Sequence, residues 1–391
     1  MDVDALGKSP IGKLVPIGGL DPRTSREWKY WAYLPDNLPE HPALSAKALN
    51  ASAKAAMSVA RLDEAVSQLP RPEIIVRPIV RREAASTSAL EGTYASFDEV
   101  LEADFLEDRE MSSEQREIRN YTIATEAAVK QVHARPISRT FLGELQRTIV
   151  RGTRGDTPDA GDLRPHQVAI GPHNSPIEES RFVPCPPGDQ LEAGVLAWQE
   201  WVEGDNDVLI IAKMALAHYQ FETLHPFGDG NGRLGRLVAL LQLMRVGELK
   251  YPVLSIAPWF ESRRQQYQDG LLAVSITGDF NPWVLFFAEA VDRQAREGLE
   301  RIQRLLALRD DMVTDVRESG LRGSSVELAE LIIGYPVIDV PTVKALIGIS
   351  FEAANQAVAR LVDKGLLREI TGRRQNRLFV CPAVLEATRW N

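Results

Sequence analysis

A glycine-rich loop between two apolar helical stretches constrains the fold of this chain more than any other feature. The loop reads His225-Pro-Phe-Gly-Asp-Gly-Asn-Gly-Arg233, and the apolar stretches run from Val208 to Leu224 before it and from Leu234 to Val246 after it. Glycines let the backbone turn tightly with its N–H groups exposed, and a helix that starts directly after the loop adds a dipole that favours an anion. The pattern predicts a phosphate-binding loop between two helices.

The charged and polar side chains of this loop also suit a polyanion. Arg233 and Arg236 share one face of the first turn of the second helix, where two permanent cations favour a bound phosphate chain. Asp229 supplies the hard oxygen ligand that Mg²⁺ prefers when it bridges phosphates, and Asn231 supplies an amide donor. His225 can take a proton near neutral pH. Together these groups indicate phosphoryl or nucleotidyl transfer, whereas the acidic ligand spacing of a calcium-binding EF-hand is missing.

The motif His225-x-Phe227-x-Asp229-Gly230-Asn231-Gly232-Arg233-x-x-Arg236 resembles, at every specified position, the active-site motif of Fic domain proteins. The resemblance implies that His225 is the general base, that Asp229 binds Mg²⁺, and that the two arginines hold the β- and γ-phosphates of ATP. Further nucleotide-binding residues are expected in the same stretch: Phe227, Gly228, Gly230, Asn231, Gly232, Leu234 and Gly235. The function implied is that of a protein adenylyltransferase, which moves AMP from ATP to a Ser, Thr or Tyr hydroxyl of a target protein.

Other reactions use the same loop. Doc-type relatives that phosphorylate their targets have an altered centre and a Lys at the first arginine, whereas this sequence keeps Gly230 and Arg233, so AMP transfer is favoured over kinase activity. Removal of AMP and transfer of another nucleotide stay open. The resemblance places the adenine pocket between Trp259 and Tyr267, with Arg263 and Tyr267 as its candidate residues, although the aromatic side chains there would equally suit a core.

A second motif resembles the inhibitory helix of the same family. Thr87-Ser-Ala-Leu-Glu91-Gly92 has the pattern of Ser or Thr, three residues, Glu, and then Gly or Asn. The resemblance implies that Glu91 pairs with Arg236 and occupies the position that the γ-phosphate needs, so that ATP binds in a pose unsuited to in-line attack. Because this helix precedes the loop in the same chain, we expect a resting enzyme with almost no activity.

Residue spacing elsewhere predicts a mainly α protein. Helical patterns are expected at 45–69, 112–133, 138–150, 189–203 and 282–318. The one strand signal before the C-terminal region lies between Arg164 and Pro184, a short β-hairpin with a wide turn. Residues 165–184 resemble the flap of Fic proteins, on which a target protein docks by adding a strand. The expected domains are an N-terminal helical region with the inhibitory helix (1–111), the Fic catalytic domain (112–300), a helical linker (301–321) and a last domain (322–391).

The last domain resembles a winged helix-turn-helix, with helices at 326–334, 341–347 and 351–364 followed by two strands at 366–370 and 378–380. Candidate phosphate contacts and base contacts in it are Arg373, Arg374 and Arg377 in the wing, and Asn355, Gln356 and Arg360 on the helix. A DNA-binding regulator with a Fic sensor domain is therefore an alternative function. Winged helices also form dimers, so a homodimer is a further expectation.

The composition and charge of the chain argue against several binding partners and kinds of site. A formal net charge of −9 argues against non-specific binding to nucleic acid or to an anionic membrane. The two cysteines, Cys185 and Cys381, are far apart and lack nearby histidines, which argues against a disulfide framework and a zinc site. The first residues lack a secretory signal pattern, and the apolar stretches are too short to cross a membrane, so a cytoplasmic protein is expected.

Overall fold

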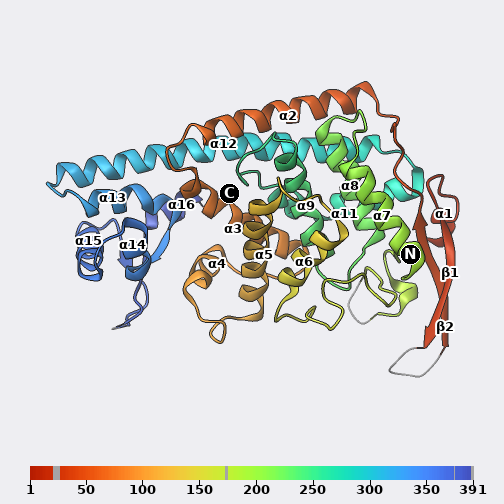
Figure 1. The fold of residues 1–391 in the computed structure, drawn as a ribbon, viewed down its shortest axis with the longest axis horizontal. Coiled ribbons are helices and arrows are strands. Elements are labelled where there is room, and N and C mark those ends of the chain that lie inside the picture. The colour runs from red at the N-terminus through yellow and green to blue at the C-terminus, as the bar shows by residue number, and fades with distance from the viewer. Residues whose placement is uncertain (21–26, 172–174, 374, 389–391) are drawn as a thin grey trace.

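Two long helices that lie side by side form the spine of an elongated molecule (Figure 1). The computed structural model describes residues 1–20, 27–171, 175–373 and 375–388. Helix α12 (Asn281–Glu318) is continuous over 38 residues, and α2 (Ala46–Ser67) packs along it. The buried face of α2 begins with the small residues Ala48, Ser52 and Ala55, which let the two helix backbones approach closely. A mainly helical fold, as predicted, is confirmed.

The central layer is built around α8 (Ile210–Leu224) and α9 (Asn231–Arg245), which are buried on nearly every side. Its other members are α5 (Ser113–Gln131), α6 (Arg139–Val150), α7 (Asp189–Glu203), α10 (Ala257–Ser262) and α11 (Arg264–Thr277). Helix α9 is buried from Asn231 to Met244. Such a helix can only lie inside the molecule, because each of its faces needs an apolar partner. The loop that joins α8 to α9 is thereby held at the centre of the fold.

The N-terminal region also contributes two helices, α3 (Pro72–Leu90) and α4 (Phe97–Glu102). Helix α3 begins with proline in its first turn, where the missing N–H costs no hydrogen bond, and ends at Glu91, which is followed by Gly92 in the left-handed region with φ of 90°. Ser96 and Glu99 form a capping box that starts α4. The shorter elements around them are α1 (Val3–Leu6), η1 (Ala103–Phe105) and η2 (Ile177–Glu179).

One expectation about strands was wrong. The N-terminal region contains an antiparallel hairpin of β1 (Gly12–Leu20) and β2 (Glu27–Pro35), so the segment from 164 to 184 is not the first strand signal. The aromatic run in Glu27–Pro35 favours a strand, and the nearby prolines obscured it. The backbone N–H of Tyr33 donates to the carbonyl of Val183 at 2.8 Å, so this hairpin supports the segment expected to be the flap.

The flap itself is less regular than predicted. Ile170 and Phe182 exchange two backbone hydrogen bonds of 2.8 and 3.0 Å in a single antiparallel bridge, in place of two strands. Residues 172–174, which belong to the predicted turn, lie outside the described part of the chain. Pro176 and Pro184 each lack a backbone donor, which limits strand formation in this segment.

The C-terminal region carries a small sheet with helices on it. Its elements are α13 (Ser324–Leu331), η3 (Ile332–Gly334), β3 (Val337–Asp339), α14 (Val340–Ile347), α15 (Phe351–Asp363), β4 (Arg368–Glu369), β5 (Leu378–Val380) and α16 (Pro382–Thr388). The sheet order is β3-β5-β4, in which β3 was not predicted. The Arg377 guanidinium donates to the Asn355 side chain at 2.9 Å, and Gln356 donates to Glu352 at 3.2 Å. Arg374, predicted in the wing, lies outside the described residues.

This region docks directly on α3 and α4. The Arg77 guanidinium of α3 lies 4.1 Å from the ring centre of Tyr335, and a Cβ on Gly334 would lie 2.4 Å from the carbonyl oxygen of Ile74. Leu101 of α4 packs in one apolar cluster with strands β3 and β5. Helix α3 is therefore held at its first turns by the C-terminal region.

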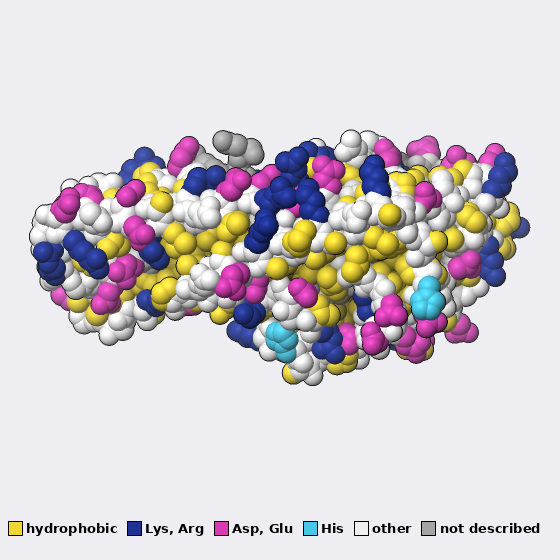
Figure 2. Space-filling view, turned by 90° about the horizontal axis from the view of Figure 1, so that it is seen from above, with side chains coloured by type: hydrophobic (Ala, Val, Ile, Leu, Met, Phe, Trp, Pro, Cys, Tyr) yellow, Lys and Arg dark blue, Asp and Glu magenta, His cyan; other side chains and the backbone are white. Residues whose placement is uncertain are grey.

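A few large apolar side chains are exposed on the surface. Figure 2 looks down on the side of α2 and α12, where hydrophobic side chains form a band between charged groups. Exposed members on α2 are Leu49 (38%) and Met57 (57%). Within the described residues, none of the helices is both long and apolar enough to cross a membrane.

Candidate active site

The loop between α8 and α9 is shaped by two left-handed residues and one side-chain amide. His225 ends α8 with φ of 50°, and Gly230 precedes α9 with φ of 80°. The Asn231 amide donates to the Phe227 carbonyl at 2.8 Å and accepts from the Phe227 N–H at 2.9 Å. The Asn231 amide therefore closes the loop, and the phosphate contact predicted for its side chain stays a prediction.

A buried arginine that sequence reasoning missed also fixes this loop. Arg164 is 1% exposed, and its guanidinium donates to the carbonyls of His225 (2.8 Å), Cys185 (2.6 Å) and His166 (3.1 Å). Its backbone N–H donates to the Pro226 carbonyl at 3.0 Å. The contacts with His225 and Pro226 join residues about sixty positions apart in the chain, so no local pattern around Arg164 could have revealed them.

Glu91 lies on Arg236, as the inhibitory motif predicts. Its Oε1 accepts from the Arg236 guanidinium at 2.6 Å, and the same guanidinium donates to the hydroxyl (2.5 Å) and the carbonyl (3.0 Å) of Thr87. Arg236 is 1% exposed. Burial acts to raise the pKa of Glu91, but the attraction of Arg236 outweighs it and lowers that pKa below its usual value. A Cβ on Gly232 would lie 2.0 Å from Oε1, so only glycine leaves room for this carboxylate.

Arg233 has different partners from Arg236. Its guanidinium donates to Glu117 at 3.0 Å and to Asp229 at 3.2 Å, and it is 2% exposed. Arg233 is absent from the lining of both cavities that adjoin the loop, whereas Arg236 lines one of them. The structure thus places the two predicted phosphate ligands in unequal positions: Arg236 faces the cleft under Glu91, and Arg233 lies behind Asp229.

One carboxylate oxygen of Asp229 lies at the edge of a cavity, as is expected of a metal ligand that acts together with substrate phosphates. Its Oδ1 accepts from the Gly230 N–H at 2.5 Å and from Arg233, while Oδ2 lies 3.5 Å from the Arg154 side chain at the edge of a cavity of about 430 Å³. The described part of the chain contains no group of three or more acidic, His or Cys side chains that could hold a metal. Mg²⁺ is commonly held by one or two carboxylates together with substrate phosphates, and Asp229 fits that arrangement.

Two cavities meet at this loop, and Glu91, His225 and Gly232 line both of them. The cavity of about 430 Å³ lies over Asp229 and the loop glycines. The other, of about 130 Å³, has mostly apolar walls from the flap, α3 and α11: Leu90, Ile170, Phe182, Tyr267, Leu271 and Leu272. Polar groups of one cavity and apolar walls of the other suit the phosphate and base ends of a nucleotide.

The two residues predicted for the adenine pocket separate in the structure. Tyr267 lines the smaller cavity, and its hydroxyl lies 2.8 Å from His218 Nε2. Arg263 stacks on Trp259, with 3.4 Å between its guanidinium carbon and the ring centre, and does not line that cavity. Tertiary packing also brings residues to this cavity that the prediction did not name as site residues: Ile170, Phe182, Gln268, Leu271 and Leu272.

Burial changes the protonation of groups around the loop. It lowers the pKa of His225 to about 4, with the nearby Arg164 acting in the same direction, so the imidazole is neutral at pH 7. His225 Nδ1 lies 3.4 Å from the Glu222 carbonyl, which favours a proton on Nδ1 and a lone pair on Nε2. Burial also raises the pKa of Glu222 to about 8, so this side chain is mainly protonated at pH 7.

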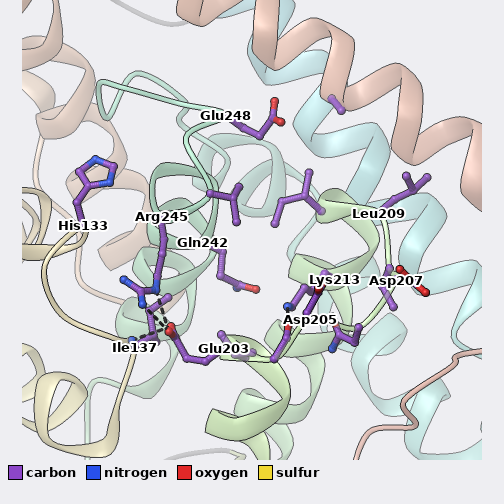
Figure 3. A pocket seen from close by; sticks show the side chains of 17 residues that line it. His133, Ile137, Glu203, Asp205, Asp207, Leu209, Lys213, Gln242, Arg245 and Glu248 are labelled. Atoms are coloured by element: carbon purple, nitrogen blue, oxygen red, sulfur yellow. Dashed lines mark hydrogen bonds and ion pairs between the residues drawn. The ribbon is translucent and has the colours of Figure 1, made fainter.

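A larger cavity than the two beside the loop lies elsewhere, between the α7–α8 connection and the end of α9 (Figure 3). It has a volume of about 960 Å³. Its charged groups are held by the protein itself: Arg245 pairs with Glu203 at 2.7 Å, and the Lys213 ammonium donates to the Gly204 carbonyl at 2.6 Å. None of the predicted site residues lines it, so we place the active site at the α8–α9 loop.

The fold and the loop together define a helical domain in which a carboxylate from an earlier helix covers a buried arginine at the start of α9. Residues 125–243 match the model of the Fic/DOC family, and residues 49–130 match that of the Fic/DOC family N-terminal region. Residues 49–243 of the chain are thus similar to the N-terminal and Fic regions of the Fic/DOC family.

Relatives and solved structures agree with this assignment. The chain is 30% identical over 182 residues to a protein adenylyltransferase Fic of Culex quinquefasciatus (44% of this chain, 33% of that protein). It is 30% identical over 208 residues to the protein of that name from Drosophila mojavensis (51% and 37%). The chain thus spans about a third of the length of these curated relatives. A crystal structure of a Fic family protein from Desulfovibrio desulfuricans G20 shares the fold, with a TM-score of 0.57 at 19% identity over 88% of this chain and 98% of that one.

Proposed function

We propose that this chain is a protein adenylyltransferase that Glu91 holds in an inactive state. The observation that carries the proposal is the Glu91–Arg236 contact of 2.6 Å, placed where two cavities meet beside His225. A carboxylate on a buried phosphate-binding arginine blocks one phosphate position and leaves room for the rest of a nucleotide. Relatives named protein adenylyltransferase Fic support the reaction type.

The transfer itself needs a base, an aligned nucleotide and a leaving group. The oxygen of a target hydroxyl bonds to the α-phosphorus of ATP, the bond from that phosphorus to the oxygen bridging to the β-phosphate breaks, and pyrophosphate leaves. His225 Nε2 accepts the hydroxyl proton. Arg236, once Glu91 has left it, holds the phosphates in line with the attacking oxygen. Asp229 would hold Mg²⁺ against the phosphates, and the chemistry that this ion supplies is neutralisation of the leaving-group charge.

We place the target protein on the 165–184 flap. The far side of this flap is occupied, because Val183 bonds to Tyr33 of β2. Val168 and Ile170, in contrast, line the two cavities, so the inner edge of the flap faces the site. An extended segment of the target would pair along this edge through main-chain hydrogen bonds, which bring its hydroxyl towards His225 without reading much of its sequence.

The central test compares wild-type chain, Glu91→Gly and His225→Ala in the Glu91→Gly background, each incubated with Mg²⁺ and ATP and analysed by intact mass spectrometry. We expect an AMP-sized adduct on Glu91→Gly, at least about tenfold more than on wild type, and none when His225 is also replaced. Equal labelling of all three chains would contradict the proposal. A phosphate-sized adduct would assign kinase activity instead.

Two further alternatives have their own readouts. A deadenylylase would release AMP from a target modified beforehand, and this release would depend on Glu91. A DNA-binding regulator would show a salt-dependent gel shift with the full chain. The Asn355–Arg377 hydrogen bond engages two of the candidate DNA contacts within the protein, so we rank this function, and a homodimer formed through the same region, below AMP transfer.

A further inference from the structure

A chain of hydrogen bonds joins the inhibitory segment to the expected metal ligand. The hydroxyl of Thr93, two residues after Glu91, donates to Glu117 Oε2 at 2.8 Å. The same oxygen accepts from Arg233 at 3.0 Å, and Arg233 donates through its other terminal nitrogen to Asp229 Oδ1 at 3.2 Å. Four side chains from three parts of the sequence thus form one continuous relay.

The middle of this relay is shielded from water. Glu117 is 8% exposed and Arg233 is 2% exposed, so their attraction is weakened little by solvent. One guanidinium therefore divides its charge between two carboxylates, one in the core and one at the cavity. Any change in the charge of Glu117 alters how strongly Arg233 holds Asp229.

The geometry at Asp229 shows which of its carboxylate oxygens the relay holds. Arg233 and the Gly230 N–H hold Oδ1, whereas Oδ2 lies towards the cavity of about 430 Å³, where its partner is the Arg154 side chain at 3.5 Å. The Arg154 side chain is 57% exposed, so this contact is screened by solvent and a cation can replace it, while the hydrogen bonds to Oδ1 keep the carboxylate oriented. Because Nη1 of Arg233 donates to Glu117, only Nη2 of its two terminal nitrogens donates to Asp229.

We infer that Glu117 is a positioning residue that acts through Arg233 to keep Asp229 available to a divalent cation, and that Thr93 links this setting to the inhibitory segment. The inference rests on the proposed function, because it takes Asp229 as the metal ligand. The inference goes beyond the proposed function in linking residues 87–93 to both arginines of the loop motif. These residues contact Arg236 directly and reach Arg233 through Glu117. Release of Glu91 and adjustment of the metal site would then be coupled.

The direct test measures cation binding in the full chain, in the Glu91→Gly background. Mn²⁺ is titrated, with free ion followed by electron paramagnetic resonance, in the presence of α,β-methylene ATP, whose α–β linkage the reaction cannot break. Glu117→Gln removes the charge that competes for Arg233, so we expect Mn²⁺ affinity to fall about tenfold, as for other residues that orient a metal ligand. Glu117→Asp, which keeps the charge, should recover most of that loss.

Glu114→Gln is the matched control, because Glu114 lies one turn earlier on α5 and accepts from Ser113 at the helix start. An affinity for Glu117→Gln within about twofold of that control would overturn the relay. If Glu117→Gln does not fold, Thr93→Val decides. It leaves the full charge of Glu117 to Arg233 and should tighten Mn²⁺ binding about threefold, and unchanged or weaker binding would overturn the inference.

The two proposals fail in different ways. If the Glu91→Gly parent forms no AMP adduct, the proposed function fails. If the parent is labelled, and His225→Ala abolishes the label, while Glu117→Gln binds Mn²⁺ as the control does, only the relay fails.

Discussion

At the scale of single residues, the site combines groups whose charges would be costly to bury alone. Arg236 is 1% exposed, and Thr87 and Glu91 together satisfy its guanidinium. A buried charge that loses a partner is strongly destabilised, so Glu91 can leave only if another anion replaces it. Under the proposed function the phosphates of ATP are such an anion, so inhibition and substrate binding would compete for one arginine.

Thr87 should share the inhibitory task with Glu91. Thr87→Val removes the hydroxyl that accepts from Arg236 and keeps the shape of the side chain, so only Glu91 and the backbone carbonyl of residue 87 still hold the arginine. We expect auto-adenylylation to rise severalfold above wild type but to stay below that of Glu91→Gly, as measured by intact mass spectrometry. Ser88→Ala is the control, because the neighbouring Ser88 hydroxyl is buried without a hydrogen-bond partner. Equal effects of both variants would contradict a specific role for Thr87.

The pKa of His225 sets where the base becomes inactive. A base works in its neutral form, which exists above its pKa, and burial lowers the pKa of His225 to about 4. Histidine-selective NMR at decreasing pH should show the His225 ring still neutral near pH 5.5, where an ordinary imidazole with a pKa of about 6.5 is mostly protonated. His225→Ala assigns the signal. A midpoint near 6.5 would show that the ring is more solvated than in this structure.

At the scale of elements, α3 is the piece that connects the site to the rest of the molecule. Its last turn carries Thr87 and Glu91 on Arg236, and its first turns contact the C-terminal region through Ile74 and Arg77. Pro78 lies in the helix interior between these two ends and removes one backbone hydrogen bond. We expect the position of Glu91 to respond to contacts made four to five turns away, because both ends belong to one continuous helix.

Tyr335→Ala tests this dependence. The change removes the ring that lies 4.1 Å from Arg77, which should cost roughly 0.5–2 kcal/mol of interaction and loosen the start of α3. We expect auto-adenylylation to rise about twofold or more in the otherwise wild-type chain and to stay unchanged in the Glu91→Gly background, where the inhibitor is already gone. Phe351→Ala, on an exposed side chain of the C-terminal region (54%), serves as control. A similar rise in both backgrounds would show that the effect bypasses Glu91.

At the scale of the whole molecule, the spine of α2 and α12 joins parts that lie far apart in sequence. Helix α12 continues without a break from the layer around α8 and α9 into the C-terminal region, where it packs on α13 and α16. The C-terminal region is thus fixed relative to the site from two sides, by α12 and by α3. This arrangement makes it a structural partner of the inhibitory helix, whatever it binds.

Local patterns were enough for much of this protein. The loop at His225 and the helices on either side of it could be predicted from the sequence, because glycines, charges and apolar spacing are patterns of a few neighbouring residues. The helix predicted at 189–203 has those bounds in α7. Irregular segments were harder to predict. Prolines obscured the strand patterns of β1 and β2. The flap forms a single bridge and not the predicted hairpin, because its backbone pairing depends on the distant strand β2.

The sequence by itself determined the chemistry of the loop and the presence of an inhibitory motif, because both are encoded in short runs of residues. Only the tertiary structure decided which groups meet. Glu91 reaches Arg236 across 145 positions, Thr93 reaches Glu117 across 24, and Arg164 fixes a loop 61 positions away. Such contacts follow from how the helices pack, and packing is a property of the whole chain that no local pattern contains.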